Sequence, residues 1–347
     1  MVLFYTMKQL LQNEIPSYKE IFSFANLFSA WREFQNEKRK KKDVMEFAEN
    51  IIHNLSVLEN DLLSGSYLHG GYFYFKIADP KPRDIHKALV RDRVVHRAIY
   101  RALYPYFDNK FIYDSYSCRL KKGTHKSINR FRDFSRIVGK NNTKTCWVLK
   151  CDIRKFFASI DHDILKRILA KYITDKDTLW LLSQVIDSFL TKDATNSAMA
   201  EFVASGEKGL PLGNLTSQLL VNIYMNEFDQ YVKRELKVKY YIRYADDFVI
   251  FSGDKKYLKN TMDQMKNFLG KDLKLNMHPD KVFIKAINSG LDFLGWVNFS
   301  KHRVLRTATK KRMFRKLKEN NYKKESLNSY LGMLSHGNGY KLELKIH

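Results

Sequence analysis

The sequence predicts an α+β fold with an antiparallel sheet, and three observations support this class. Between Asp43 and Gly65, apolar residues recur at spacings of three and four, the period of an amphipathic helix. At 239–253, two runs of β-forming residues flank Asp246 and Asp247, which predicts a strand–turn–strand unit. Helical and strand-forming segments also follow one another in mixed order, which favours an antiparallel sheet.

The remaining elements are assigned along the chain in the same way. We expect a strand at 72–77, a helix at 84–107, a buried strand that leads into a helix within 146–165, helices at 215–236 and 255–269, a hairpin that turns at Lys301–His302, and a small helical piece over 301–347.

The composition indicates a polyanionic partner. The 347 residues include 61 Lys and Arg against 37 Asp and Glu, a net charge of +24, and residues 301–347 alone hold 13 basic and 3 acidic residues. Such a surplus favours nucleic acid through counterion release and long-range steering. We expect no membrane contact, because no apolar run reaches transmembrane length and the N-terminus lacks the features of a secretory signal.

The cysteines indicate a reducing compartment rather than a disulfide framework. Cys118, Cys146 and Cys151 form no CxxC pair, so the sequence supports neither a disulfide framework nor a zinc site. We therefore expect a cytoplasmic protein.

Three carboxylates form the candidate catalytic site. Asp246 and Asp247 repel each other at the tip of a predicted turn, and Asp152 ends the apolar run that begins at Trp147. If the two strands are neighbours, these oxygen ligands converge and suit Mg²⁺ or Mn²⁺. Two such ions, roughly 4 Å apart, would clamp the attacking 3′-hydroxyl and the leaving pyrophosphate of a nucleotide transfer. The simpler alternatives are an Asp-rich hairpin turn and, for Asp152, a helix cap or an ion pair.

An ordered set of motifs resembles those of reverse transcriptases. "DIRKFF" at 152–157, "GLPLGNLTSQLLVNIYMNEFD" at 209–229 and "YADD" at 244–247 are similar to the palm motifs. The finger motifs, the last palm motif and the primer grip are matched by 79–96, 115–128, 273–283 and 292–296. The resemblance implies a right-hand polymerase with an N-terminal helical extension at 1–75, fingers at 76–145, a palm at 146–300 and a thumb at 301–347.

The resemblance also implies roles for individual residues. Asp152, Asp246 and Asp247 match the metal-binding triad, with the Ile153 carbonyl as a further ligand for two Mg²⁺ or Mn²⁺ ions. Lys281 matches a position that could protonate pyrophosphate, although an exposed lysine without such a role is the simpler alternative.

A second group of residues matches positions that contact the incoming dNTP and the nascent base pair. Arg83 and Arg119 match finger positions that hold the triphosphate, and Phe157 matches the aromatic residue that excludes a 2′-hydroxyl. The nascent base pair would be contacted by Leu212, Gly213 and Gln218. For neighbouring Phe156 a core position is expected, and Arg91 and Arg93 are candidates for either template contacts or surface ion pairs.

The middle palm motif resembles one sub-family. Most reverse transcriptases carry Gln before the Gly of this motif, whereas this chain has Leu212 before Gly213, and "LGNLTSQ" is similar to enzymes of diversity-generating retroelements. Those enzymes copy a template-repeat RNA into cDNA with frequent errors at adenines, and the cDNA diversifies a target gene. The implied partners are the template RNA, the RNA/cDNA primer duplex and a small basic oligomeric accessory variability protein.

Other functions remain open at this stage. They are a retron or phage-defence reverse transcriptase, a non-catalytic nucleic-acid-binding relic of the fold, and a template-independent nucleotidyl transferase. The short stretch after the thumb motifs leaves no room for a ribonuclease H, intron-maturation or endonuclease domain, so we expect the enzyme to rely on other factors.

Overall fold

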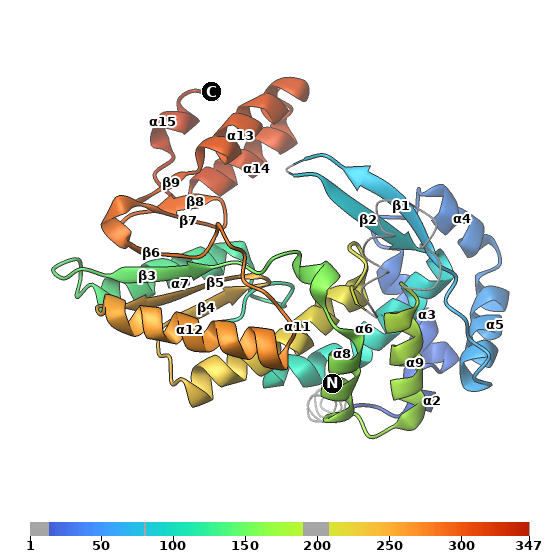
Figure 1. Ribbon diagram of the computed structural model, residues 1–347. Helices are drawn as coiled ribbons and strands as arrows, with labels where there is room; N and C mark the ends of the chain where they lie inside the picture. Colours follow the sequence, from blue (N-terminus) through green and yellow to red (C-terminus); the bar gives the residue numbers. More distant parts are fainter. Residues whose placement is uncertain (1–13, 80, 190–207, 347) are drawn as a thin grey trace, which may run out of the picture. The chain divides into compact units, whose positions relative to one another are not determined.

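The computed structural model describes residues 14–79, 81–189 and 208–346. These residues divide into two compact units, each assembled from segments that are distant in the sequence (Figure 1). The first unit lies within Met1–Ile112, Lys155–Gln230 and Gly270–Leu275, and the second within Tyr113–Arg154, Tyr231–Leu269 and Asn276–His347.

The first unit is mainly helical. Its helices are α2 (Tyr18–Ile21), α3 (Phe24–Phe34), α4 (Lys42–Glu49), α5 (Ile51–Leu63), α6 (Val90–Lys110), α8 (His162–Ala170), α9 (Lys176–Asp187) and α11 (Leu215–Gln230). A two-stranded antiparallel sheet joins β1 (Tyr72–Ile77) to β2 (Arg83–Ala88).

Two predicted elements of this unit differ from the structure. The helix expected from Asp43 to Gly65 is interrupted at Asn50, whose φ of −121° and ψ of 41° separate α4 from α5. The helix expected at 84–107 starts only at Val90, because the residues before it pair with β1. The segment RDIHKA has little intrinsic strand preference, so pairing with the aromatic strand YFYFKI determines its conformation.

The second unit contains the larger sheet. Its strands are β3 (Trp147–Cys151), β4 (Tyr241–Tyr244), β5 (Asp247–Ser252) and β6 (Phe283–Ala286), in the order β4-β5-β3-β6 with every pair antiparallel. A three-stranded antiparallel sheet follows, formed by β7 (Leu291–Phe293), β8 (Trp296–Asn298) and β9 (Arg303–Leu305). The predicted α+β class with antiparallel sheets is therefore confirmed.

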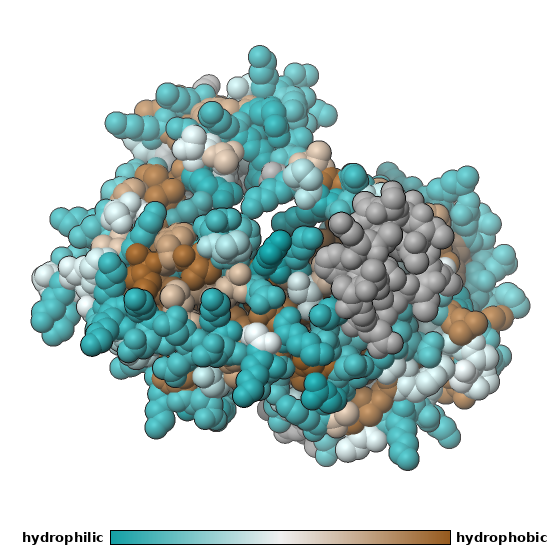
Figure 2. Space-filling model, in the orientation of Figure 1, coloured by the Kyte–Doolittle hydropathy of each residue, from teal (hydrophilic) through white to brown (hydrophobic). Residues whose placement is uncertain are grey.

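Helices complete this unit. They are α7 (Thr124–Val138), α12 (Lys255–Asp272), α13 (Thr307–Glu319), α14 (Lys324–Leu334) and α15 (Tyr340–Glu343), and the last turn of α12 belongs to the first unit. Figure 2 shows mostly hydrophilic side chains over α13 and α14, in agreement with the basic composition of 301–347. In the described part of the chain, no helix is both long and apolar enough to cross a bilayer.

One apolar core joins α7, the four-stranded sheet and the C-terminal helices. Ile128, Phe131 and Phe134 of α7 pack in the same buried cluster as Val148 of β3 and Phe251 of β5. The rings of Phe131 and Phe251 meet edge to face at a centroid distance of 4.8 Å, a favourable geometry for aromatic pairs. This core fixes the sheet that carries the candidate catalytic carboxylates.

The predicted hairpin near the C-terminus is confirmed, with an additional turn. β8 and β9 pair around residues 299–302, as the sequence predicts. A second turn, at Leu294–Gly295, pairs β7 with β8, and both of its residues have positive φ values, 50° and 86°. The sequence signal for that turn is weak because leucine rarely adopts a left-handed conformation.

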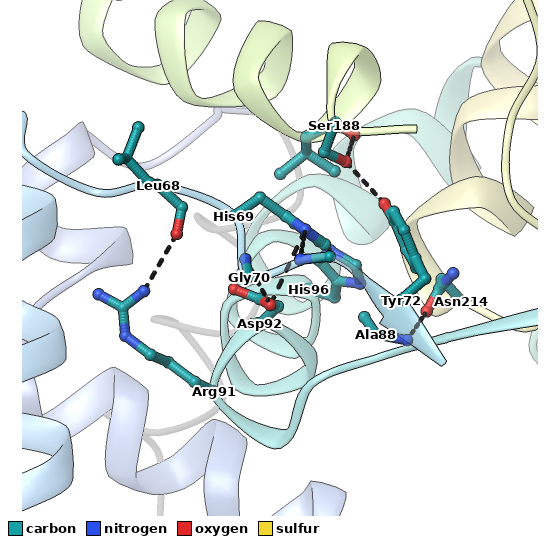
Figure 3. Close-up of polar contacts among 12 residues, drawn as sticks. Leu68, His69, Gly70, Tyr72, Ala88, Arg91, Asp92, His96, Ser188 and Asn214 are labelled. Atoms are coloured by element: carbon teal, nitrogen blue, oxygen red, sulfur yellow. Dashed lines mark hydrogen bonds and ion pairs between the residues drawn. The ribbon is translucent and has the colours of Figure 1, made fainter. Parts of the chain in front are cut away.

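A buried polar cluster lies in the core of the first unit, between the segment before β1 and helix α6 (Figure 3). Asp92 accepts hydrogen bonds from the Tyr67 hydroxyl (2.7 Å) and the Gly70 amide (2.9 Å). The Nδ1 atom of His69 accepts a hydrogen bond from the Gly71 amide, so in the neutral ring the proton is on Nε2. This Nε2 donates a hydrogen bond to His96 Nε2 at 3.3 Å. Burial and the nearby His69 and Arg93 charges lower the pKa of His96 from 6.5 to about 3.

We expect this histidine to make the protein less stable in mild acid. His96 stays neutral in the folded state, whereas the unfolded chain binds a proton below about pH 6.5, so stability falls as pH falls from there towards pH 3. The loss between pH 7 and pH 5 amounts to about 2 kcal/mol. Denaturant unfolding of His96→Gln should show a correspondingly smaller pH dependence. The exposed His53→Gln should match the wild type, and an unchanged pH slope in His96→Gln would contradict the assignment.

Candidate active site

The predicted carboxylates lie at one end of the four-stranded sheet. Asp152 directly follows β3, Asp246 lies in the turn between β4 and β5, and Asp247 is the first residue of β5. β3 and β5 are neighbours, and Cys151 pairs with Phe248. Continuing that antiparallel register by one residue places Asp152 opposite Asp247, on adjacent strands. The expected condition, that the two strands are neighbours, is met.

A buried arginine that the sequence analysis missed holds the turn. Arg243 on β4 is 0% exposed, and its guanidinium donates to the Ala245 carbonyl (3.1 Å) and to the Ser115 hydroxyl (3.2 Å). Its backbone is also bonded to Asp114 and Tyr116. Ala245 has a φ of 55°, an unusual conformation for a residue with a Cβ. In the sequence, the sign that could have identified Arg243 is a charged residue inside an otherwise apolar strand.

The carboxylates carry more negative charge than their surroundings compensate. Burial, followed by the charge of Asp247, raises the pKa of Asp246 to about 6. The pKa of Asp247 is also raised, first by burial and then by Asp152, although Lys150 opposes this shift. Lysines approach two of the three side chains: Lys150 Nζ lies 3.3 Å from Asp247 Oδ1, and Lys281 Nζ lies 3.0 Å from Asp152 Oδ1.

The donor set suits a divalent cation, but the carboxylates are not yet arranged around one. Within residues 14–79, 81–189 and 208–346, no three His, Cys, Asp or Glu side chains form a group that could hold a metal ion. Asp247 Oδ1 is buried in an ion pair with Lys150, but it accepts no well-aligned hydrogen bond from the described residues. Ile153 lies opposite Met277 in an isolated antiparallel bridge, in which the Arg154 amide donates to the Asn276 carbonyl and the His278 amide donates to the Asp152 carbonyl. The Ile153 carbonyl accepts no hydrogen bond from the described residues. These oxygens are hard ligands of the kind that Mg²⁺ prefers.

Lys150 is a second residue that the sequence analysis missed. It belongs to β3, where the register places it opposite Val249, two residues from Asp247 on the same face of the sheet. A lysine inside the run WVLKC is unusual for a buried strand, and this was the available signal. Its ion pair partly balances the charge of Asp247.

The other predicted residues divide between the two units. Lys281 and Arg119 belong to the second unit with the carboxylates, and Arg119 donates to the Ser115 carbonyl at 3.0 Å. Ser115 thus contacts both Arg119 and the turn-holding Arg243. The first unit contains Arg83, Phe157, Leu212, Gly213 and Gln218. The roles assigned to both groups stay predictions.

In the first unit, the loop before α11 is fixed to strand β2. The Leu212 carbonyl accepts the His86 amide at 3.0 Å, and Asn214 bonds the His86 carbonyl at 2.8 Å. Gly213 has a φ of 109°, and a Cβ there would lie 2.9 Å from Ile85 Cγ2. A larger residue would therefore disturb this contact.

The remaining candidate residues of this unit differ in their exposure, and two of them form ion pairs within the protein. Phe156 is buried, as expected, whereas Phe157 is only half-buried, and Arg83 is exposed at the start of β2. Arg91 and Arg93 form ion pairs with Asp61 and Asp43, which attach α6 to the helices before it. The ion-pair alternative for Arg91 and Arg93 is therefore the one observed.

Comparison with known proteins identifies the family of the chain. Residues 79–298 match the family described as reverse transcriptase (RNA-dependent DNA polymerase), and this match covers more than half of the chain. The chain belongs to the reverse transcriptase family, whose reaction is RNA-directed DNA synthesis.

Two bacterial proteins are similar to the chain in sequence, and a telomerase structure is similar in part. Protein YkfC of Escherichia coli (strain K12) is 29% identical over 290 residues, which cover 74% of this chain and 72% of YkfC. Group II intron-encoded protein LtrA of Lactococcus lactis subsp. cremoris is 24% identical over 306 residues, which cover 70% of this chain and 47% of LtrA. A structure of Candida albicans telomerase with a fragment of telomeric RNA has a TM-score of 0.48 and 12% identity, and covers 70% of this chain and 47% of that one. The chain thus spans about half the length of LtrA and of the telomerase.

The Arg243 contacts can be tested with a conservative substitution. In Arg243→Lys, one ammonium nitrogen replaces the two separate guanidinium nitrogens that bond the Ala245 carbonyl and the Ser115 hydroxyl, so we expect one of these buried contacts to be lost. We expect the free energy of unfolding to fall by about 1–3 kcal/mol and cDNA synthesis to slow because the turn is less firmly placed. Denaturant unfolding and primer extension measure the two effects. Arg312→Lys, on α13, serves as the control, and equal behaviour of the two variants would refute a role for Arg243 in holding the turn.

Proposed function

We propose that the chain copies RNA into DNA at the carboxylate end of the β4-β5-β3-β6 sheet. The observation that supports this proposal most directly is the position of Asp152 opposite Asp247, with Asp246 beside them, in a chain of the reverse transcriptase family. Asp152, Asp246 and Asp247, with the Ile153 carbonyl, would hold Mg²⁺. The bound ions would activate the 3′-hydroxyl of the primer and neutralise the pyrophosphate that leaves.

The two lysines at the site have different roles in this proposal. The side chain of Lys150 is mostly buried and its strand is central in the sheet, so it would hold the Asp247 carboxylate in place and oppose the rise in its pKa. The side chain of Lys281 is 45% exposed. It would release Asp152 to a cation and direct its ammonium group to the phosphates of the substrate, where it could donate a proton to the leaving group.

The substrate contacts follow from the family motifs. Arg119 and Arg83 would bind the triphosphate of the incoming dNTP, because guanidinium groups bond phosphate oxygens in pairs. Phe157 would exclude nucleotides that carry a 2′-hydroxyl. Leu212, Gly213 and Gln218 would contact the nascent base pair.

We further propose that the enzyme serves a diversity-generating retroelement. It would make adenine-mutagenic cDNA from a template-repeat RNA and act with a small basic oligomeric accessory variability protein. The sequence LGNLTSQ at 212–218, and Leu212 in particular, supports this sub-family. The match to the reverse transcriptase family supports reverse transcription without selecting a biological role, so the error spectrum of the cDNA is the decisive property.

The carboxylate assignment predicts a variant that binds but does not polymerise. Asp246→Asn removes a metal-binding charge, and we expect cDNA synthesis to fall by about 10³-fold or more, while template binding stays close to that of the wild type. Primer extension on an RNA template and fluorescence anisotropy with the same template measure the two properties.

The control for this variant is Asp263→Asn, an exposed aspartate on α12 of the same unit. It should polymerise normally. Normal synthesis by Asp246→Asn, or loss of its folded structure, would show that Asp246 is not a metal ligand of the reaction.

The sub-family assignment predicts that Leu212 lowers fidelity at template adenine. Leucine packs against the nascent pair but cannot donate or accept a hydrogen bond. Leu212→Gln would add a polar contact worth about 0.5–1.5 kcal/mol, or roughly a 2- to 13-fold change in discrimination. We expect fewer errors opposite adenine than the wild type makes, with smaller changes opposite the other bases. Sequencing of cDNA made from one defined RNA measures this.

The exposed Leu68→Gln is the matched control, because it makes the same replacement on the surface of the first unit. Its error spectrum should equal that of the wild type. If Leu212→Gln and Leu68→Gln show equal adenine errors, Leu212 is a packing residue and the sub-family proposal loses its main support.

A further inference from the structure

A basic pocket lies in the second unit, away from all of the candidate catalytic residues. Its volume is about 380 Å³, within the range of ligand-binding pockets, and it is formed by α7, the β8–β9 hairpin and the turn after α14. Among the described residues, no Asp or Glu lines it. The basic residues that line it are Arg132, Arg136, Lys301, His302, Arg303 and His336, and we call it the arginine pocket.

The buried member of the pocket, Arg303, lacks a full set of hydrogen-bond acceptors. The residue is only 6% exposed, and its Nη2 donates to Asn129 Oδ1 at 3.0 Å. Its Nη1 is buried and has no acceptor among the described residues. An unpaired buried donor is costly and uncommon in folded proteins. An acceptor supplied by a ligand would remove this cost.

The charges around Arg303 also favour an anion. Arg132 and Arg136 are one turn apart on α7, and together with burial they lower the pKa of Arg303. Asp133 partly offsets them, but its carboxylate is paired with Arg132 at 3.5 Å. For Arg136, the described chain provides no ion-pair partner. Three guanidinium groups that repel one another form a site that a phosphate oxygen can satisfy, because arginine bonds phosphate through two parallel contacts.

We infer that the arginine pocket binds a phosphate group of a nucleic-acid strand through Arg303, Arg132 and Arg136. Its size exceeds that of a single phosphate ion. Phe299 and His302 also line it, with their rings stacked at a centroid distance of 4.8 Å, and such rings can stack on a base. The preference for a phosphate follows from the pocket alone, whereas the assignment to a nucleic-acid strand also rests on the proposed function.

Helix α7 relates the pocket to the carboxylates. The Thr124 hydroxyl, at the start of α7, is bonded to the hydroxyl of Tyr244, which pairs with Asp247. Arg132 and Arg136 lie two to three turns further along, about 12–18 Å at 1.5 Å per residue. A strand that advances about 3.4 Å per nucleotide covers this distance in about four or five nucleotides. The pocket therefore lies along α7 from the residue that bonds Tyr244, and a strand of this length would span from that residue to the pocket.

The test compares two double variants with the same change of charge. Arg132→Gln with Arg136→Gln alters the pocket, and Lys259→Gln with Lys266→Gln alters exposed lysines of α12. Binding of an RNA oligonucleotide is measured by fluorescence anisotropy over a series of KCl concentrations, without divalent ions. We expect the pocket variant to bind about threefold to tenfold more weakly, and its log–log salt slope to decrease by about 0.7–0.9 per lost phosphate contact. The control should change less than twofold.

The same measurement separates this inference from the proposed function. It is made in the Asp246→Asn background, so it requires no polymerisation. Equal binding by the pocket and control variants would overturn the inference. A second outcome would also overturn the inference: inorganic phosphate stabilises the wild type but not the pocket variant, and the two proteins bind RNA equally well. The ligand of the pocket would then be a free anion. Arg303→Gln extends the test to the buried residue. If that variant does not fold, the double variant of Arg132 and Arg136 decides the result.

Discussion

The antiparallel pairing of β3 with β5 is the constraint on which the candidate active site depends. It brings Asp152, from a strand near the middle of the sequence, opposite Asp247, nearly a hundred residues later. Two carboxylates on adjacent strands repel each other, and burial raises the cost. Burial raises the pKa of Asp247 first, and the charge of Asp152 across this pairing raises it further, while Lys150 of β3 forms an ion pair with Asp247.

The sheet tolerates that repulsion because other interactions fix its edges. The α7 side of the sheet is covered by a large aromatic core, which keeps β3 and β5 in register. Arg243 fixes the turn between β4 and β5, where Ala245 adopts a conformation that is unfavourable for residues other than glycine. Stability is thus provided away from the carboxylates, by the core on one face of the sheet and by Arg243 at the turn.

The sequence predicted the elements that follow local patterns. The turn at Asp246, the strand ending at Cys151 and the helix beginning after Asp161 all carry strong local signals, and each occurs in the structure. β2 was missed because its strand conformation depends on pairing with β1 rather than on its own composition. The break at Asn50 was missed because the apolar period continues across it.

As with the fold, the parts of the candidate site that lie in local motifs were predictable from the sequence, and the parts that depend on distant contacts were not. The carboxylates lie in motifs and were found, whereas Arg243 and Lys150 act through contacts with residues distant in the sequence. The arginine pocket was invisible for the same reason, since it collects residues from α7, a hairpin loop and the turn after α14. Charge in the sequence indicated a nucleic-acid partner but could not indicate where arginines gather in space.

The discontinuity of the two units has a consequence for synthesis on the ribosome. The first unit includes Gly270–Leu275, and there the Tyr224 hydroxyl bonds the Leu273 carbonyl while Lys274 pairs with Asp161. These contacts cannot form until residue 275 has been translated, although most of the unit is made long before. The second unit draws α13 and α14 into its core and is completed later still. The apolar surfaces that these late segments cover therefore stay open until residues 270–275 and then α13 and α14 are made, and chaperone binding competes with aggregation in that interval.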